Sequence, residues 1–139
     1  MKHLCLLAFF FQFVAAYGQM PVVTPVGAGM AHATVALNAP VSLFNNQAGM
    51  TGLTKIAVVA AAERRFMVSE LQSVAVAAAL PTRSGTFGLT LQSFGFEEFR
   101  QQKVGVAYAR KLWNSLSVGA QFDYFQTRIP EYGSQATLT

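Results

Sequence analysis

Positions 116 to 124 read Leu116-Ser117-Val118-Gly119-Ala120-Gln121-Phe122-Asp123-Tyr124, so that apolar residues alternate with small or polar ones. Successive side chains of a β-strand point to opposite faces of its sheet, and a strand here would have one apolar and one polar face. The ranges 87–92 and 104–109 repeat the alternation. Short, turn-forming connections between such stretches predict hairpins. The sequence therefore predicts an all-β fold with antiparallel strands.

The range 55–126 divides into five strands of this kind, and the residues from Gly133 onward read as the start of a sixth. Charged residues gather in or near the gaps, at Glu63-Arg64-Arg65, at Glu97, Glu98, Arg100 and Lys103, and at Arg110-Lys111. Longer and shorter connections alternate, as in outer-membrane barrels, whose long loops lie outside the cell and whose short turns lie in the periplasm. The alternation predicts a periplasmic amino terminus.

Two kinds of exported β protein fit this alternation: a membrane barrel, apolar outside, and a soluble lipid-carrying barrel or sandwich, apolar inside. A soluble barrel needs a strongly polar outer face, whereas the second face here is mostly Gly, Ala, Ser, Thr and Gln. We therefore predict part of an antiparallel transmembrane β-barrel over residues 55–139. The residues predicted to face lipid are Phe87, Leu89, Leu91, Val104, Val106, Leu116, Val118 and Phe122, and those predicted to face the lumen are Gly105, Gly119, Gln121 and Asp123.

The chain opens with a short basic start and an apolar run from Leu4 to Ala16 that is too short to cross a bilayer as a helix. This pattern predicts a signal peptide over residues 1–18, with cleavage after Gly18 or, alternatively, after Ala16. Cys5 is the only cysteine and lies inside this leader, so the mature chain is expected to have neither disulfides nor cysteine-ligated metals. Export and apolar strands together predict an outer-membrane location.

Residues 19–54 are rich in Gly, Ala and Pro and show no strict alternation, which favours short helices and loops. A compact segment before the first strand could sit in the lumen as a hatch or plug. Small inward residues on the strands would then permit close packing against it. They are Ala75, Ala77, Ala79, Gly105, Ala107 and Ala109. Asp123 also faces inward and is expected to pair with a basic group such as Arg110 or with the hatch backbone, or alternatively to act as a selectivity charge in the lumen.

Other functional classes find little support. The net charge is +4 with 12% charged residues and no Lys/Arg stripe, so no nucleic-acid partner is expected. His32 is flanked by alanines without a nearby acid, which favours a packed or loop histidine over a catalytic one. Gly27-x-Gly29 lacks the third glycine of a nucleotide-binding fingerprint. We therefore expect no enzyme activity, no cofactor and no metal.

The range 27–37, followed by Leu43-Phe44-Asn45-Asn46-Gln47-Ala48-Gly49-Met50, resembles the amino-terminal hatch of FadL-like outer-membrane barrels. More closely, it resembles the PorV/PorQ-type branch of Bacteroidetes, where an Asn-Pro-Ala-Gly-Leu motif precedes the first strand. Gln47 stands where that motif has proline, and Met50 where it has leucine. The ranges 81–88 and 106–112 are similar to the same branch. The resemblance marks Gly27, Gly29, Asn46, Ala48 and Gly49 as hatch-motif residues.

This resemblance implies a plugged monomeric barrel with one of three roles. The first is association with type IX protein secretion, in which the barrel binds or anchors exported proteins at the cell surface. The alternatives are a FadL-like channel for hydrophobic small molecules and a structural barrel without a transport role. Expected partners are outer-membrane lipid and lipopolysaccharide, together with secreted proteins or other secretion components. Since closed barrels need about eight strands or more, we expect an amino-terminal fragment, a truncated product or several copies sharing one barrel.

Overall fold

The structure is a computed structural model that describes residues 24–31, 33–130 and 133–138. The predicted signal peptide, residues 1–18, lies outside the described residues, as do positions 19–23 of the predicted hatch. His32 and the positions 131, 132 and 139 also lie outside them.

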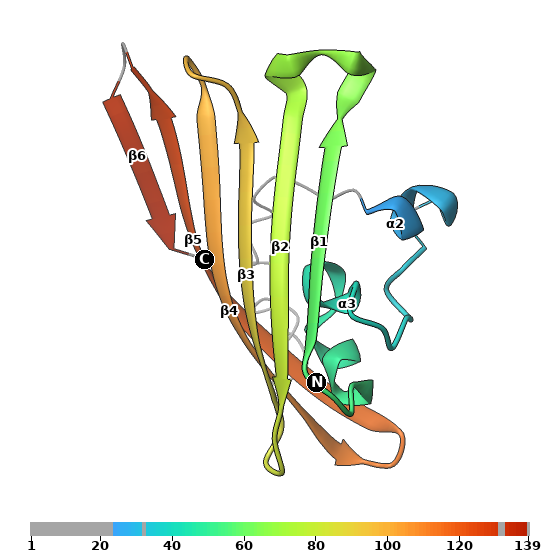
Figure 1. Ribbon diagram of the computed structural model, residues 1–139. Helices are drawn as coiled ribbons and strands as arrows, with labels where there is room; N and C mark the ends of the chain where they lie inside the picture. Colours follow the sequence, from blue (N-terminus) through green and yellow to red (C-terminus); the bar gives the residue numbers. More distant parts are fainter. Residues whose placement is uncertain (1–23, 32, 131–132, 139) are drawn as a thin grey trace, which may run out of the picture.

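The described chain is mostly β-structure and forms one six-stranded antiparallel sheet (Figure 1), which confirms the prediction of antiparallel strands. The strands are paired in chain order, each with its neighbours in the sequence. They are β1 (Ala57–Arg64), β2 (Gln72–Pro81), β3 (Thr86–Gly95), β4 (Arg100–Trp113), β5 (Leu116–Ile129) and β6 (Gly133–Leu138). Several charged residues that were expected in the gaps, such as Arg100 and Lys111, lie inside β4. Near a strand end a long basic side chain can reach water, so the pairing continues past it.

The connections leave the sheet at two ends (Figure 1). The upper end carries the connections 65–71 and 96–99, and the lower end carries 82–85 and 114–115. The first connection is the longest and contains the 3-10 turns η2 (Arg65–Met67) and η3 (Ser69–Leu71). The connections 82–85 and 96–99 are equally long, so the predicted alternation of longer and shorter connections fails at this pair.

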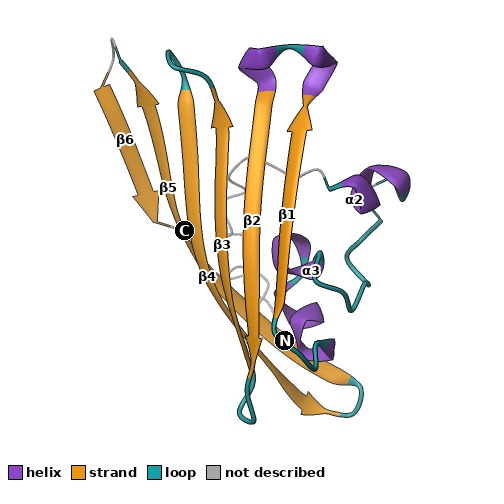
Figure 2. Cartoon of the chain, in the orientation of Figure 1, coloured by secondary structure: helices purple, strands orange, loops and turns teal. Residues whose placement is uncertain are grey.

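Short helices precede the sheet, in the segment where the sequence favours them (Figure 2). They are α2 (Pro25–Gly29), α3 (Ser42–Asn45) and η1 (Gln47–Gly52). We call residues 24–56 the N-terminal segment. Its α3 contacts β2 and β3, and its η1 contacts β3, β4 and β5, so that the segment covers one face of the sheet. No helix among the described residues combines the length and the apolar character needed to cross a bilayer.

The core lies between the N-terminal segment and this covered face of the sheet. Leu43 and Met50 are fully buried there, and Phe44, Leu53 and Val59 pack around them. The strands supply small buried residues, namely Ala77, Ala79, Ala107 and Ala109. Alanine lets the backbone of the sheet come close to the segment, which confirms that the small inward residues receive close packing.

The opposite face of the sheet, here the open face, is uncovered in the described structure. It carries all eight residues predicted to face lipid, whose exposed fractions run from 39% at Val104 to 74% at Phe122. Register places them in rows across the strands, for example Leu91 beside Val104, and Val106 beside Phe122. The alternation thus separates a continuous apolar face from a face of small and polar residues.

Candidate functional site

A polar cluster lies on the covered face and centres on Gly105 of β4. The register sets Gly105 between Thr90 of β3 and Asp123 of β5. The Oδ1 atom of Asp123, the Oγ1 atom of Thr90 and the amide nitrogen of Gln121 all occupy the space that a Cβ at Gly105 would need. A side chain at this position would displace the three polar groups, so glycine lets the cluster keep this arrangement.

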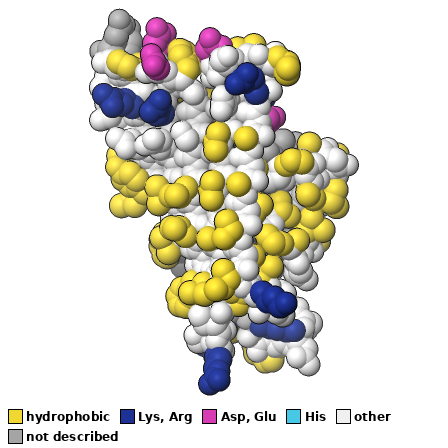
Figure 3. Space-filling model, in the orientation of Figure 1, with side chains coloured by type: hydrophobic (Ala, Val, Ile, Leu, Met, Phe, Trp, Pro, Cys, Tyr) yellow, Lys and Arg dark blue, Asp and Glu magenta, His cyan; other side chains and the backbone are white. Residues whose placement is uncertain are grey.

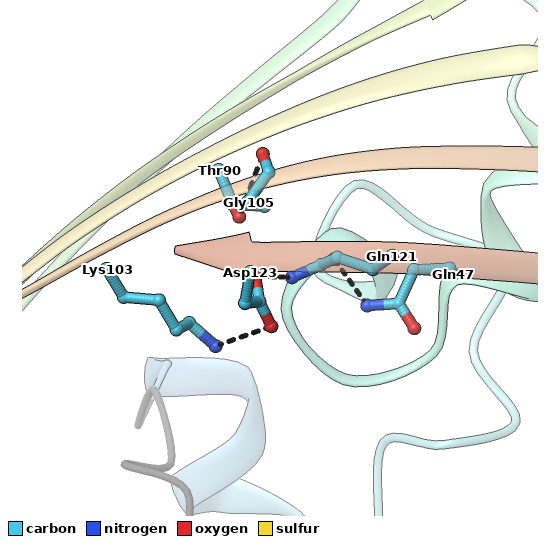
Figure 4. Close-up of polar contacts among 6 residues, drawn as sticks. All are labelled: Gln47, Thr90, Lys103, Gly105, Gln121 and Asp123. Carbon is cyan, nitrogen blue, oxygen red and sulfur yellow. Dashed lines mark hydrogen bonds and ion pairs between the residues drawn. The ribbon is translucent and has the colours of Figure 1, made fainter. Parts of the chain in front are cut away.

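Four side chains form a continuous chain of polar contacts in this cluster (Figure 4). Lys103 Nζ lies 3.6 Å from Asp123 Oδ2. Gln121 Nε2 donates to Asp123 Oδ1 at 2.6 Å, and Gln47 Nε2 donates to Gln121 Oε1 at 2.6 Å. The carboxylate fixes which way the Gln121 amide points, and that amide in turn fixes Gln47. The chain of contacts therefore joins the sheet to η1 with a defined geometry.

The ion pair in this cluster is largely removed from water. The side chains of Lys103 and Asp123 are exposed by 16% and 13%. A charge at such a position is stable only when it is paired, because burial costs it the hydration that it has in water. Lys103 and Asp123 therefore each need the charge of the other to be stable on the covered face.

The prediction that Asp123 pairs with a basic group is confirmed, but that group is Lys103 and not Arg110, the example given. Arg110 lies opposite Val118 in the register and shares the open face with it, whereas Asp123 points to the covered face. A residue of β4 can face Asp123 only if it has the same parity as Gly105. Lys103 has this parity and Arg110 does not. The alternation places Lys103 and Lys111 on the face of Asp123, and the register puts Lys103 closer, two residues from Gly105.

A second anchor joins η1 to β5 without charge. An added Cβ at Gly119 would lie 2.6 Å from the Ala48 backbone nitrogen, so the two backbones approach closely. Nearby, Thr51 Oγ1 lies 2.9 Å from Ser117 Oγ and donates to it. The lumen-facing prediction thus groups Gly105, Gly119, Gln121 and Asp123 correctly on one face, and this face contacts the N-terminal segment.

The hatch-motif residues fall into two groups. Asn46 shapes η1, because its Oδ1 accepts from the Ala48 backbone N–H at 3.1 Å and its Nδ2 donates to the Val35 carbonyl at 2.7 Å. Gly49 allows close packing, since an added Cβ would lie 2.8 Å from the Leu37 carbonyl oxygen. Gly27 and Gly29 instead belong to α2, and a Cβ at Gly29 would meet nothing within 4 Å. Close packing therefore explains why a glycine is needed at position 49, but it does not explain the glycine at position 29.

Sequence reasoning missed two features of the structure. Gln92 is only 6% exposed and lies between Ala75 and Lys103 in the register, and its amide has no hydrogen-bond partner among the described residues. Phe66 and Met67 have positive φ angles of 54° and 60°, and both are 87% exposed at the upper end. The burial of Gln92 depends on the neighbouring strands, which no short-range pattern shows, and neither Phe nor Met favours a positive φ angle.

The contacts of the cluster join β4 and β5 to η1 of the N-terminal segment. Among the described residues, no group of three or more His, Cys, Asp or Glu side chains is placed to bind a metal ion. Comparison with known proteins adds no relative: no family model, no curated protein and no solved structure matches this chain.

Proposed function

We propose that the sheet is a section of the wall of an outer-membrane β-barrel, with the open face in contact with lipid and the N-terminal segment inside as a hatch. The observation that carries this proposal is the contrast between the two faces. One presents large apolar side chains to the outside, and the other presents small and polar residues to a packed segment. Soluble proteins rarely expose a continuous apolar surface of this kind, whereas lipid requires one.

The distribution of charge along the strands supports the same placement. In Figure 3 the hydrophobic side chains fill the middle of the visible surface, and the basic and acidic side chains lie toward its two ends. Aromatic residues also occur near the strand ends, including Tyr108 and Trp113 toward the lower end and Phe99 at the upper end. A band of apolar residues between charged and aromatic borders is the pattern of a membrane-spanning wall.

The outer edges of β1 and β6 are unpaired in the described sheet. In hydrocarbon, each backbone N–H or C=O group without a partner costs several kcal/mol, so a sheet cannot remain open there. The proposal therefore includes further strands, from a longer chain or from additional copies, that pair with both edges and close the barrel.

Insertion into lipid provides the direct test. The mature chain, refolded with phosphatidylcholine vesicles, is expected to float with them after an alkaline carbonate wash, and the fluorescence of Trp113, the only tryptophan, is expected to shift to the blue. Apolar strands and an interfacial indole would both account for this result. A folded monomer that remains in water without detergent would contradict the proposed membrane wall.

For the role of the barrel, we propose association with type IX protein secretion, in which the upper end receives an exported protein at the cell surface. The PorV/PorQ-type resemblance suggests this role, and the connection between β1 and β2 supports it. Phe66 and Met67 lie in left-handed conformations that are costly for residues other than glycine, and such conformations cluster at binding sites. Large apolar side chains on an exposed tip are typical anchors for a protein partner.

Replacing both tip residues, Phe66→Ala and Met67→Ala, is expected to lower capture of exported proteins about tenfold, because two apolar anchors are removed. The measurement is crosslinking of exported proteins to the barrel on intact cells, normalised to the amount of barrel in the outer membrane. Leu112→Ala, an exposed apolar residue toward the lower end, is the matched control and should leave capture unchanged. Equal capture by the tip variant and the control would contradict a role of this tip in secretion.

A further inference from the structure

Two arginines lie directly opposite each other on the open face, at its upper end. Arg100 of β4 is paired with Arg128 of β5 in the register, and both residues are exposed. They have the parity of Val104 and Phe122, whose side chains belong to the same face. Opposed residues on one face have Cβ atoms about 5 Å apart, and like charges at this spacing destabilise the pairing of the strands. An anion bound to both side chains would remove this repulsion.

The described part of the chain does not supply that anion. Neither arginine takes part in an ion pair among the described residues, where the ion pairs use other basic groups. Glu97 and Glu98 precede Arg100 in the connection to β4, but neither forms an ion pair with it. In Figure 3 basic side chains border the hydrophobic middle of the visible surface at its upper end. The arginine pair therefore presents positive charge at the edge of the apolar surface.

A groove of about 300 Å³ lies beside this pair on the same face. Six of its lining residues have the parity of the open face and form two rows across the interior strands β2, β3 and β4: Val74, Ser93 and Gln102 in the row nearer the upper end, and Val76, Leu91 and Val104 in the next. The first row contains two polar side chains, and the second is wholly apolar. Gln102 follows Arg100 by two residues on β4, so the polar mouth of the groove is about 7 Å from the arginine pair.

We infer that the arginine pair and this groove bind an anionic phospholipid, with its phosphate at Arg100 and Arg128 and one acyl chain along the groove. Guanidinium groups bind phosphate oxygens through two parallel hydrogen bonds each. The Ser93 hydroxyl and the Gln102 amide can donate to the ester oxygens between the phosphate and the chain. The apolar row beyond them matches a hydrocarbon chain. Both parts of the lipid thus find a matching part of one surface.

The position of the site favours a lipid over a free anion. A chain that follows the groove away from the arginines runs along the apolar residues of the open face, which the proposed function places in contact with hydrocarbon. Free phosphate would use the arginines but not the groove. The inference rests on the proposed membrane wall and adds a lipid-binding site at its upper border.

Tyr124 offers a place for a local probe, since it lies on the open face opposite Val104. Each protein in the experiment carries Tyr124→Trp together with Trp113→Phe, which leaves one tryptophan at this border. The full mature chain is inserted into phosphatidylcholine vesicles that contain an increasing share of brominated phosphatidylglycerol or, in parallel, of brominated phosphatidylcholine. Bromine quenches nearby indole fluorescence. We expect the anionic lipid to give half-maximal quenching at about one fifth of the share that phosphatidylcholine needs, because a basic residue near a membrane surface enriches anionic lipid about fivefold.

The double variant Arg100→Gln/Arg128→Gln should abolish this preference. Arg83→Gln/Arg110→Gln is the matched control, because it removes two arginines from the lower end and should keep the preference. Quenching by brominated phosphatidylcholine shows in each case that the variant is inserted. An equal loss of preference in both double variants would mean diffuse attraction of anionic lipid by the whole chain, and this would overturn the site.

The remaining outcomes separate this site from the membrane wall. Equal quenching by both lipids, with the arginine pair intact, would overturn the lipid site and leave insertion standing. Absence of quenching by either lipid would show that the chain does not insert, which overturns both proposals. Inorganic phosphate at millimolar concentration is added as a competitor and should leave the preference unchanged. Loss of the preference on this addition would mean that the arginines hold phosphate alone, which contradicts the lipid assignment.

Discussion

Replacement of Asp123 by alanine is expected to lower the free energy of unfolding by about 3 kcal/mol, because Lys103 would keep a buried charge without a partner. The same change removes the acceptor that orients Gln121, and with it the contact of Gln121 with Gln47. We expect the N-terminal segment to loosen as well. Urea titration of the mature chain in phospholipid vesicles, followed by Trp113 fluorescence, measures the loss, and protease digestion of the segment measures its release.

The double variant Asp123→Ala/Lys103→Met separates the charge from the packing. It removes both members of the pair, and a neutral side chain of similar length then fills the place of the lysine. We expect it to recover most of the lost stability, since a buried ion pair can often be replaced by apolar groups at little cost. A double variant as unstable as Asp123→Ala alone would contradict the ion pair as the source of the effect.

Placing an arginine in the middle of the open face, as in Val106→Arg, is expected to reduce the stability of the inserted state by about 2 to 4 kcal/mol. Val106 is 56% exposed and lies beside Phe122, so its side chain would meet the apolar band directly. Phe122→Arg should have an effect of the same size. The measurement is the fraction of chain that floats with vesicles across a urea series.

Gln102→Arg is the matched control for Val106→Arg. It lies on the same strand and the same face, four residues closer to the upper end, where lysine and arginine side chains reach water. Its cost should be between zero and about 1 kcal/mol, because the penalty falls toward the interface. Equal costs at positions 102 and 106 would contradict the depth that the proposal assigns to them.

The sequence predicts the faces of the sheet well, since the alternation is a local property of each strand. Phe122 and Gln121 are assigned to opposite faces by parity alone, and the structure agrees. The small residues at Ala107 and Ala109 likewise indicate a closely packed neighbour before that neighbour is known. Strand ends are less well defined, because Arg100 and Lys111 can be accommodated inside β4 as easily as outside it.

The polar contacts of the cluster could not be derived in the same way. Gln47 meets Gln121 across 74 positions of the chain, and no local pattern indicates which turn of the N-terminal segment lies over which strand. Charge alone makes Arg110 a possible partner of Asp123, whereas the alternation of side chains along β4 places Arg110 on the other face. The left-handed backbone at Phe66 and Met67 was missed because neither residue type favours it.

The path of the N-terminal segment sets an order for folding. Its helix η1 comes before β1 in the chain, yet it rests on β3, β4 and β5. Each hairpin can form from neighbouring residues, whereas the surface for η1 exists only after β5 has joined the sheet. Contacts between distant positions form slowly, because a long loop must close first. We therefore expect η1, although it is made before every strand, to dock only after β5 has been added.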